Sequence, residues 1–550
     1  MLARALLLCV LGLCVDVARA QPVLVSPLPH GIVQVTKDRQ AGALRIIVRS
    51  GKTAGDQVLA IDHRFTDAYN KSLFSEYWSS LRASNGAIDV TLNVPFYGKS
   101  FKLHYRIVTP DSIYQGEVQD LAIGHVFGVA GQSNAEGWSP PPYPRPVGDV
   151  RVLRGTKVWE YGSNPSGGRW NGPWVYMANK FRELVPDGLP IGIVNAAEGG
   201  TSLAVWWTQS GNWIRNNSIP DDIYTVYGRA LRMFRAAGAN MEAMFWIQGE
   251  ADVVETSIEG YRAAFRQLVL NLESDLQHDL NFYHLQISGQ LDNGGEWRPL
   301  GWGWIREAQR DLPESKLVGS AVAYPISFDG IHYEITTTET VGHRFAAAVA
   351  HEQYGISSAL YPAMLPDTAI FVYIDSLRPE LGWKVLLRCT QGENAAGLDP
   401  NEKLYQFELR CADARFDTTR VTARVHSYAP GWIEVWLEDS VILDTAGWYL
   451  SYAVRADVQG ANVLDTCTAS NLPNALVAFL DLPIGSGSEP ERPEPQRVAD
   501  EPESTQDCVV RYFDLTGRHI DLNRRDLAPG PYLEVRGCGG RISTQKWLVR

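Results

Sequence analysis

The stretch that decides the fold is Gly131-Gln132-Ser133-Asn134, which directly follows the run Ile123–Ala130 (IGHVFGVA). This run is almost wholly apolar or small, and it predicts a buried β-strand. Many α/β enzymes present a nucleophilic serine just beyond such a strand, between a small residue and an amide. Glycine, serine and asparagine are also favoured in turns. The stretch therefore predicts a turn at a strand end, with Ser133 as a candidate nucleophile.

Strand and helix patterns alternate around this turn, over residues 121–356. The predicted buried strands are Ile123–Ala130, Ile191–Ala196, Ala243–Gln248, Phe282–Ile287 and Leu317–Val322. The predicted amphipathic helices are Tyr224–Ala237, Ser257–Leu276 and Thr337–Tyr354. This alternation predicts a parallel sheet with helices on both faces.

Side chains suited to chemistry follow several of these strands. The candidates are Ser133, the pair Gly199-Gly200, the segment Gln248-Gly249-Glu250, Asp329 and His332. In open α/β sheets ligands bind beyond the carboxyl ends of the strands, which share one edge of the sheet. The sequence therefore predicts that these residues meet in one site.

The candidates include the groups that ester hydrolysis requires. Ser133 can attack a carbonyl, and His332 can take its proton and return it to the leaving alcohol. Asp329 stands three residues before His332, with Gly330 between them. Glycine permits a tight turn there, so the carboxylate can fold back onto the imidazole and fix its tautomer.

The oxyanion would need hydrogen-bond donors, and three are expected: the backbone N–H groups of Ser133 and Gly200 and the side-chain amide of Gln248. Asn134 is expected to hold the nucleophile turn by side-chain hydrogen bonds. Two roles stay open for Glu250. It is either a buried carboxylate that braces the turn, or the partner of an arginine or of the histidine in place of the aspartate.

Taken singly, each residue also has a purely structural interpretation. Ser133 can be a helix N-cap, His332 a loop histidine bonded to backbone, and Asp329 an ordinary turn residue. The interpretation as a catalytic site depends on their occurring together in one chain.

Four places in this block resemble the SGNH-hydrolase superfamily, in its sialate O-acetylesterase and acetylxylan esterase branch. The matching segments are Gly131-Gln132-Ser133-Asn134, Gly199-Gly200-Thr201, Gln248-Gly249-Glu250 and Asp329-x-x-His332. Two residues depart from the pattern. Glu198 replaces a tryptophan before the two glycines, and Ala135 replaces a methionine after Asn134.

The resemblance implies a three-layer α/β/α, flavodoxin-like hydrolase domain with a parallel sheet, flanked by β-sandwich-like domains. It also implies a serine esterase without metal or cofactor that removes acetyl groups from sugar hydroxyls, as in acetylated xylan or acetylated sialic acid. Glu198 bears on the pocket wall, and so on substrate preference, more than on the reaction. Two alternatives stay open: a non-catalytic carbohydrate-binding or surface protein with an inactive hydrolase-like domain, and a lipase or thioesterase on the same fold.

Aromatic and sulfur-containing residues add two expectations. The chain has 17 tryptophans, and core packing is the first interpretation of any single one. Flat aromatic faces also suit sugar rings, which makes Trp206, Trp207, Trp302 and Trp304 candidates for lining a sugar site. The five cysteines after the signal all lie beyond residue 388, which excludes thiol catalysis and a cysteine-ligated metal in the middle block. Cys508 with Cys538 is a plausible disulfide.

Charge and the N-terminus indicate where the protein works. The net charge is −12 and no basic stripe is visible, which argues against nucleic acid as a partner. Residues 1–20 have the pattern of a cleaved secretory signal, with Arg4, an apolar stretch and Ala18-Arg19-Ala20. No run is long and apolar enough for a stable membrane span. We expect a secreted or cell-surface protein.

The length of 550 residues predicts several domains. The expected order is a signal at 1–20, an N-terminal β domain at 21–120, the esterase-like domain at 121–356, a β-sandwich-like domain at 357–483, a flexible linker at 484–507 and a β module at 508–550. The last module resembles the C-terminal sorting domain that type IX secretion machinery reads. That machinery is therefore an expected partner.

Overall fold

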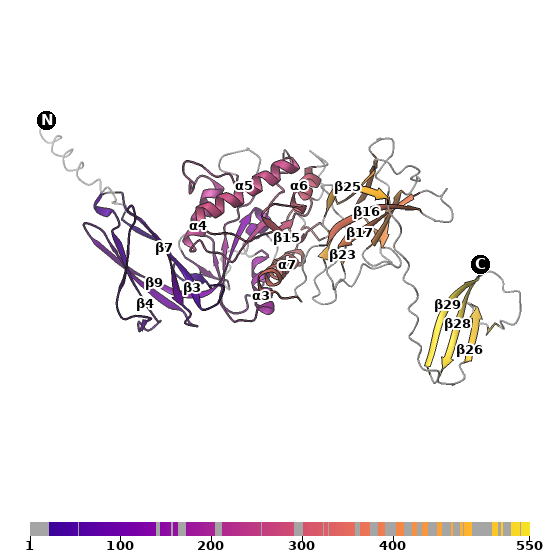
Figure 1. Ribbon diagram of the computed structural model, residues 1–550, viewed down its shortest axis with the longest axis horizontal. Helices are drawn as coiled ribbons and strands as arrows, with labels where there is room; N and C mark the ends of the chain where they lie inside the picture. The colour runs from indigo at the N-terminus through magenta and orange to yellow at the C-terminus, as the bar shows by residue number, and fades with distance from the viewer. Residues whose placement is uncertain are drawn as a thin grey trace, which may run out of the picture. The chain divides into compact units, whose positions relative to one another are not determined.

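The computed structural model of the chain contains two compact units, residues 1–489 and residues 490–550 (Figure 1). The described residues are 21–52, 54–138, 144–155, 158–162, 172–203, 212–254, 256–290, 301–322, 324–327, 329–357, 364–373, 383–390, 403–411, 421–425, 432–437, 448–453, 464–465, 474–476, 478–486, 509–514, 519–520, 530–538 and 541–549. The expected signal at 1–20 lies outside them, and so does the expected linker beyond residue 486.

The first part of the larger unit is a β structure. Its elements are β1 (Val23–Ser26), β2 (Ile32–Gln34), β3 (Ala41–Arg49), η1 (Ala54–Asp56), β4 (Ala60–Thr66), β5 (Ser72–Leu73), β6 (Ser79–Arg82), β7 (Ile88–Pro95) and β8 (Phe101–Val108). β3 is antiparallel to β1 and β7, and β4 is antiparallel to β5, β6 and β8. Their inward side chains, such as Ile46, Ile61 and Leu103, share one apolar core.

One long strand, β9 (Ile113–Gly131), connects this β structure to the rest of the unit. Its first half is antiparallel to β8, and its second half is parallel to both β12 and β13. Up to Asp120, exposed residues alternate with partly or fully buried ones, whereas every residue from Leu121 to Gly131 is buried. The domain boundary expected after residue 120 therefore falls inside a continuous strand.

The central sheet has the strand order β11-β10-β12-β9-β13-β14-β15. The strands after β9 are β10 (Val150–Leu153), β11 (Glu160–Tyr161), β12 (Ile191–Asn195), β13 (Ala243–Ile247), β14 (Phe282–Gln286) and β15 (Ser315–Ser320). All neighbouring strands in this order are parallel except the pair β10 and β11. The predicted parallel sheet is confirmed.

Within the described residues, six helices accompany the sheet. They are α2 (Ser133–Glu136), α3 (Trp174–Leu184), α4 (Val226–Ala236), α5 (Ile258–Leu276), α6 (Gly301–Arg310) and α7 (Ile335–Tyr354). The sequence pattern predicts α4, α5 and α7 to within two residues at each end, but it does not predict α3 or α6. Thr225 and Ser257 cap α4 and α5, since each side chain accepts a hydrogen bond from the N–H three residues on.

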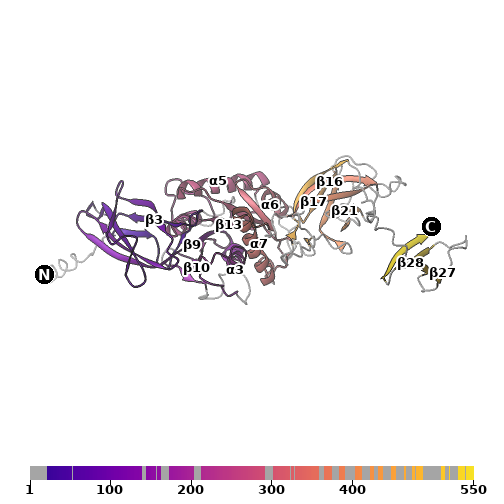
Figure 2. The ribbon, with the colours of Figure 1, turned by 60° about the horizontal axis from the view of Figure 1, so that its bottom comes forward.

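Two apolar cores lie against the central sheet. Val126 and Ala130 of β9 belong to the core that contains α4, α5 and α6, whereas Phe127 and Val129 belong to the core that contains α3 and α7. Because successive side chains of a strand point to opposite faces, the two cores lie on opposite faces of the sheet. Both views show α5 and α7 on opposite sides of it (Figures 1 and 2).

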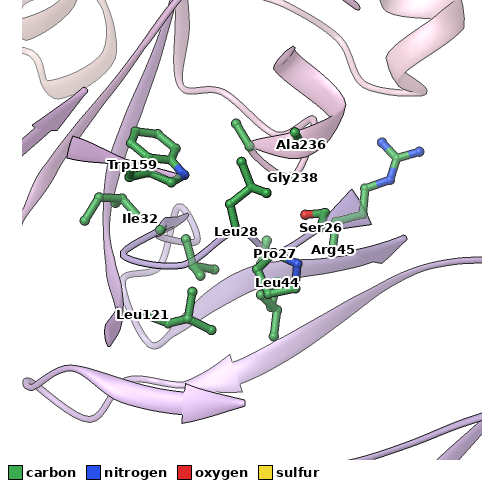
Figure 3. Close-up of a pocket in the computed structure, with 14 residues that line it drawn as sticks. Ser26, Pro27, Leu28, Ile32, Leu44, Arg45, Leu121, Trp159, Ala236 and Gly238 are labelled. Carbon is green, nitrogen blue, oxygen red and sulfur yellow. The ribbon is translucent and has the colours of Figure 1, made fainter. Parts of the chain in front are cut away.

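The β structure packs closely against this part of the unit. Leu28, Ile32, Leu121 and Trp159 surround a cavity of about 10 Å³ (Figure 3), which has room for about one water molecule. At the same junction the Arg45 guanidinium donates to the Leu276 carbonyl oxygen over 2.5 Å. The junction therefore carries a polar contact in addition to apolar packing.

A second β structure follows α7. Its strands are β16 (Leu365–Tyr373), β17 (Trp383–Thr390), β18 (Lys403–Leu404), β19 (Phe407–Cys411), β20 (Val421–Val425), β21 (Trp432–Leu437), β22 (Trp448–Tyr452), β23 (Leu464–Asp465), β24 (Asn474–Ala475) and β25 (Phe479–Ser486). Cys389 in β17 is a buried free thiol.

Buried polar contacts dock this structure on the central sheet. The Gln286 side chain bonds both backbone groups of Ala478, and the buried Arg306 donates to the Ala453 carbonyl oxygen over 2.8 Å.

The smaller unit is an antiparallel sheet of four described strands, in the order β27-β26-β28-β29. They are β26 (Val509–Asp514), β27 (His519–Ile520), β28 (Gly530–Cys538) and β29 (Arg541–Val549). The candidate disulfide between Cys508 and Cys538 lies outside the described residues and side chains. Nowhere in the described ranges is a helix long and apolar enough to span a bilayer.

A buried charge cluster lies near the start of the parallel part of β9. The two ring nitrogens of His125 lie 2.6 Å from Glu242 Oε2 and 2.9 Å from Asp187 Oδ2. Gln34 of the N-terminal β structure also donates to Glu242 Oε2. Burial alone would lower the pKa of His125, but hydrogen bonds and charges from the two carboxylates raise it to about 9. His125 is therefore a buried imidazolium at neutral pH.

This cluster predicts a loss of stability in mild alkali. The pKa of His125 in the folded state lies above its usual value, so its stabilising contribution is complete below about pH 6.5 and is lost as the pH rises through about 9. The loss is on the order of 3 kcal/mol. Denaturant unfolding between pH 6 and pH 9.5 measures it, and His125→Gln should be less stable at pH 6 and nearly independent of pH over this range. Glu242→Gln should move the loss to lower pH. If His278→Gln flattened the profile as much as His125→Gln, the cluster would not be its source.

Candidate active site

The nucleophile turn is fixed against the end of β13. Gly131 has a φ of +126°, and a Cβ there would lie 2.1 Å from the Ile247 carbonyl oxygen, so only glycine fits. The next backbone N–H, of Gln132, donates to the same oxygen over 2.9 Å. Ser133 then begins α2 and is half-buried. In the part of the chain that the structure describes, its backbone N–H has no acceptor, so it can serve a ligand.

Asp329 and His332 form a hydrogen-bonded pair across a tight turn. Gly330 takes a φ of +82°, and the turn brings His332 Nδ1 to 2.6 Å from Asp329 Oδ2. The other carboxylate oxygen accepts hydrogen bonds from the Ser327 hydroxyl and from the backbone N–H groups of Ile331 and His332. This carboxylate can hold the imidazole in the tautomer that carries its proton on Nδ1.

The same contacts keep Asp329 ionised. Burial by itself would raise its pKa, but the hydrogen bonds from Ser327, His332 and Ile331 hold the pKa well below its usual range. A permanently charged carboxylate next to Nδ1 stabilises the imidazolium that forms when Nε2 takes a proton.

Asn134 brings the nucleophile turn to the histidine loop. Its Oδ1 accepts the backbone N–H of Tyr333 over 3.2 Å, and its Nδ2 lies 3.4 Å from the carbonyl oxygen of Ile331. Both contacts flank His332, and Asn134 directly follows Ser133. One side chain therefore ties together the two segments that carry the candidate nucleophile and base.

Glu250 supports Asn134 from beneath. Its Oε1 accepts the Asn134 Nδ2 hydrogen over 2.9 Å, while its Oε2 is buried with no hydrogen-bond partner within the described ranges. Burial raises the pKa of this carboxyl group. Of the two roles left open by the sequence, the contacts are those of a brace for the turn. The acid bonded to His332 is Asp329.

The Ser133 hydroxyl and the His332 imidazole are not hydrogen-bonded to each other in this structure. His332 is fixed on one side by Trp138, whose ring stacks on it with centroids 5.2 Å apart and an interplanar angle of 17°. Nε2 of His332 has no partner among the described residues. Catalytic hydrogen bonds are often long without substrate, so the missing contact does not conflict with a role of His332 as a base.

The segment Glu198–Thr201 lies beside the nucleophile. A Cβ on Gly199 would be 3.5 Å from Ser133 Cβ. The Gly199 N–H donates to Glu136 Oε2 over 2.8 Å, whereas the Gly200 N–H has no acceptor within the described part of the chain. Glu198, which replaces the tryptophan of the resembling family, pairs with Arg229 on α4 through both carboxylate oxygens. This wall of the site is charged and polar.

Gln248 is placed differently from the expectation. Its side chain is fully buried, and Nε2 donates to Asp252 Oδ2 over 2.6 Å and lies within 3.2 Å of two further oxygens, on Gln132 and Thr201. Its Oε1 accepts the Tyr261 hydroxyl. With its donors in use, Gln248 is not offered to an oxyanion, and its contacts are those of a support for the turn.

Two carboxylates of the site were missed by the sequence reasoning. Glu136 accepts hydrogen bonds from Gly199 and Trp138, and burial raises its pKa. Asp252 is fully buried and bonds Gln248 and the N–H of Leu203. Glu136 lies three residues after Ser133, on the same short helix. This spacing could have indicated that its carboxylate belongs to the site. Across the described residues, no cluster of His, Cys, Asp or Glu is arranged to hold a metal ion.

The tryptophan candidates have mixed outcomes. Trp302 is only 4% exposed, packs in the core beside α5, and carries the Arg306 guanidinium 5.3 Å over its ring. It is a core residue, and the prediction that it lines a sugar site was wrong. Trp304, two residues on, is half-buried. Trp206 and Trp207 lie outside the described residues.

Comparisons with known proteins concern the fold and the sequence of this part of the chain. A solved carbohydrate acetylesterase from Xanthomonas citri, XAC1771, superposes with a TM-score of 0.60 at 20% identity, over 83% of this chain and 99% of that protein; at this identity the likeness concerns the fold. A probable carbohydrate esterase of Arabidopsis thaliana, At4g34215, is 29% identical over 181 residues, which span 32% of this chain and 62% of the plant protein, less than two thirds of its length. Residues 123–351, which contain the whole site described above, match the model of the family described as carbohydrate esterase, sialic acid-specific acetylesterase.

Proposed function

We propose that this protein is a serine esterase that removes O-acetyl groups from carbohydrates, such as acetylated xylan or acetylated sialic acid. The observation that supports the proposal is the bridge from Asn134, the residue after Ser133, to the backbone on either side of His332, whose Nδ1 lies 2.6 Å from Asp329 Oδ2. The family match over residues 123–351 and the names of the two relatives support the same class of reaction.

In the proposed mechanism Ser133 Oγ attacks the acetyl carbonyl carbon while His332 Nε2 takes the hydroxyl proton. The charge that develops on the carbonyl oxygen is met by the free backbone N–H groups of Ser133 and Gly200. The tetrahedral intermediate then expels the sugar alkoxide, which receives the proton from the imidazolium. Water attacks the acetyl-serine by the same proton path and releases acetate. Gln248 is left out of this scheme because its amide is already bonded.

The charged wall of the site favours a sugar over a lipid or a thioester. Glu136 and the Glu198–Arg229 pair lie on the side of Ser133 formed by residues 198–201. Carboxylates and guanidinium groups form strong hydrogen bonds with hydroxyl groups, whereas they would have to be desolvated against an alkyl chain. The polar wall is therefore the feature that favours an acetylated carbohydrate over the rival acyl substrates.

The first prediction concerns the nucleophile. Ser133→Ala should lower the hydrolysis of an aryl acetate by more than 10³-fold, because no other group near the acyl carbon can form the acyl-enzyme. The free energy of unfolding should be unchanged within about 1 kcal/mol, since the half-buried hydroxyl makes no hydrogen bond to any described residue. Steady-state kinetics and a melting curve on the same preparation measure both.

The same preparations distinguish the rival functions. Acetylated xylan, an acetylated sialoside and medium-chain esters are assayed side by side with Ser133→Ala as the blank. Faster turnover of the medium-chain esters would favour a lipase or thioesterase. A wild-type protein that binds the polymers but hydrolyses none of these esters would be the non-catalytic binding protein. More than a few per cent of activity left in Ser133→Ala would refute the assigned nucleophile.

The second prediction separates the roles of the two carboxylates. Asp329→Asn should lower kcat by roughly 10²–10⁴-fold, because the amide cannot stabilise the imidazolium and can favour the wrong tautomer. Glu250→Gln should stay within about tenfold of wild type, because the raised pKa of Glu250 favours its neutral form and glutamine retains an acceptor for Asn134. Full pH profiles of kcat measure the difference. A larger loss from Glu250→Gln than from Asp329→Asn would reverse the two roles.

We also propose that the protein is exported and carries a type IX sorting tail. The support is the signal-like pattern of residues 1–20 and the resemblance of residues 508–550 to such tails. Expressed in a bacterium with a type IX system, the chain should reach the cell surface or medium with Gln21 as its N-terminus. Deletion of residues 508–550 should retain it in the periplasm. Fractionation and N-terminal sequencing test this. Equal export of the truncated chain would remove the address function.

A further inference from the structure

A cleft of about 540 Å³ lies beside the middle of β9, where the antiparallel half of the strand passes into its parallel half. It is bounded by the loop that joins β7 to β8, by the turn before β12 and by the β10–β11 edge of the sheet. Asp120 lies in its lining and Gly131 at the end of the strand, so the strand distance between them is up to roughly 36 Å at about 3.3 Å per residue. The cleft is separate from the candidate active site, and its size is that of a ligand site.

Its floor is a rigid hydrogen-bonded platform. The Arg151 side chain is 3% exposed and bonds both oxygens of Asp149, at 3.0 and 2.7 Å, and the carbonyl oxygens of His30 and Asp120. Its guanidinium lies 5.0 Å from the centre of the Tyr161 ring, and the Tyr161 hydroxyl donates to Asp120 Oδ2 over 2.5 Å. Tyr161 is thus held in place, yet 46% of its surface is exposed.

A second exposed ring lines the cleft. Phe96, in the loop after β7, is 44% exposed. A large apolar surface exposed on a soluble protein without a core function often marks a binding site. The two rings come from different parts of the fold, and residues of β9 line the same cleft.

The charges lining the cleft select the chemistry of the ligand. Asp120, Asp149 and Asp187 face Arg151 and Lys99 around it, so the lining carries one net negative charge. Asp187 also pairs with His125, so the lining has no surplus of positive charge that would attract an acidic polymer. A carboxylate oxygen can accept a further hydrogen bond from a hydroxyl group. Exposed aromatic rings next to such acceptors suit a ligand with apolar C–H faces and hydroxyl edges.

We propose that this cleft is a second carbohydrate-binding site, which takes a segment of a neutral polysaccharide chain away from the catalytic centre. Tyr161 and Phe96 supply stacking surfaces, and the carboxylates at the floor accept hydroxyl hydrogen bonds. Binding at the cleft needs no hydrolysis, so the proposal stands or falls independently of the esterase mechanism.

The test uses the full-length Ser133→Ala protein, which cannot alter the polymer. Affinity electrophoresis in gels that contain xylan, glucomannan or mixed-linkage β-glucan gives a dissociation constant for each neutral polysaccharide. At least one should retard the protein. Tyr161→Ala and Phe96→Ala should each weaken that binding by roughly threefold to tenfold, while Tyr161→Phe, which keeps the ring, stays within about twofold. Tyr69→Ala removes a ring that is 91% exposed and does not line the cleft, and it is the matched control with no change expected.

A second measurement excludes damage to the fold. In the protein that retains Ser133, Tyr161→Ala and Phe96→Ala should leave kcat/KM on an aryl acetate unchanged, because that substrate is too small to reach the cleft. The proposal is overturned if none of the three polymers retards the protein, or if the two alanine variants bind as tightly as their parent. Polygalacturonate is the acidic polysaccharide in the comparison. The proposal is also overturned if the protein binds it as tightly as the neutral polysaccharides.

Discussion

The arrangement of the candidate active site depends on the side chain of Asn134. Its two hydrogen bonds to the backbone on either side of His332 join a turn at the end of β9 to a loop almost two hundred residues later in the chain. A single amide has this effect because both of its polar atoms are buried and fixed, the nitrogen by Glu250 as well. In a closely packed interior such contacts permit little relative motion. Ser133 and His332 therefore owe their relation to a neighbour of the nucleophile, while Asp329 fixes the ring itself.

Around this bridge the site is supported in layers. Gln132, Gln248 and Asp252 form a buried network beneath the turn, and its members have acceptors or donors on one another. Buried polar networks of this kind are stable only when they are satisfied. Beside this network, the second carboxylate oxygen of Glu250 has no hydrogen-bond partner within the described ranges, and burial of this carboxyl group favours its neutral form. The polar interior thus positions the turn, and the charged wall of Glu136 and Glu198 faces the ligand side.

Much of the fold follows from sequence periodicity, and the parts that do not have identifiable causes. The strands of the parallel sheet are nearly continuous apolar runs, which makes β9, β12 and β13 predictable. α6 escapes prediction because Gly301 and Gly303 are poor helix formers, and its helical state depends on tertiary packing. The Asp329–His332 spacing identifies a pair that can close locally. The hydrogen bond from Gly199 to Glu136 and the contact of Arg306 with the Trp302 ring form only when the chain folds. Residue types alone therefore misassign Trp302 and do not identify Glu136.

The unbroken course of β9 has a consequence for how this protein can be divided. The strand that carries the nucleophile turn at one end is paired at the other end with β8, and between them with β2. A cut near residue 120 would sever one backbone and leave unpaired strand edges on both fragments. The N-terminal β structure is therefore no interchangeable appendage. A modular swap must rebuild that strand from its middle.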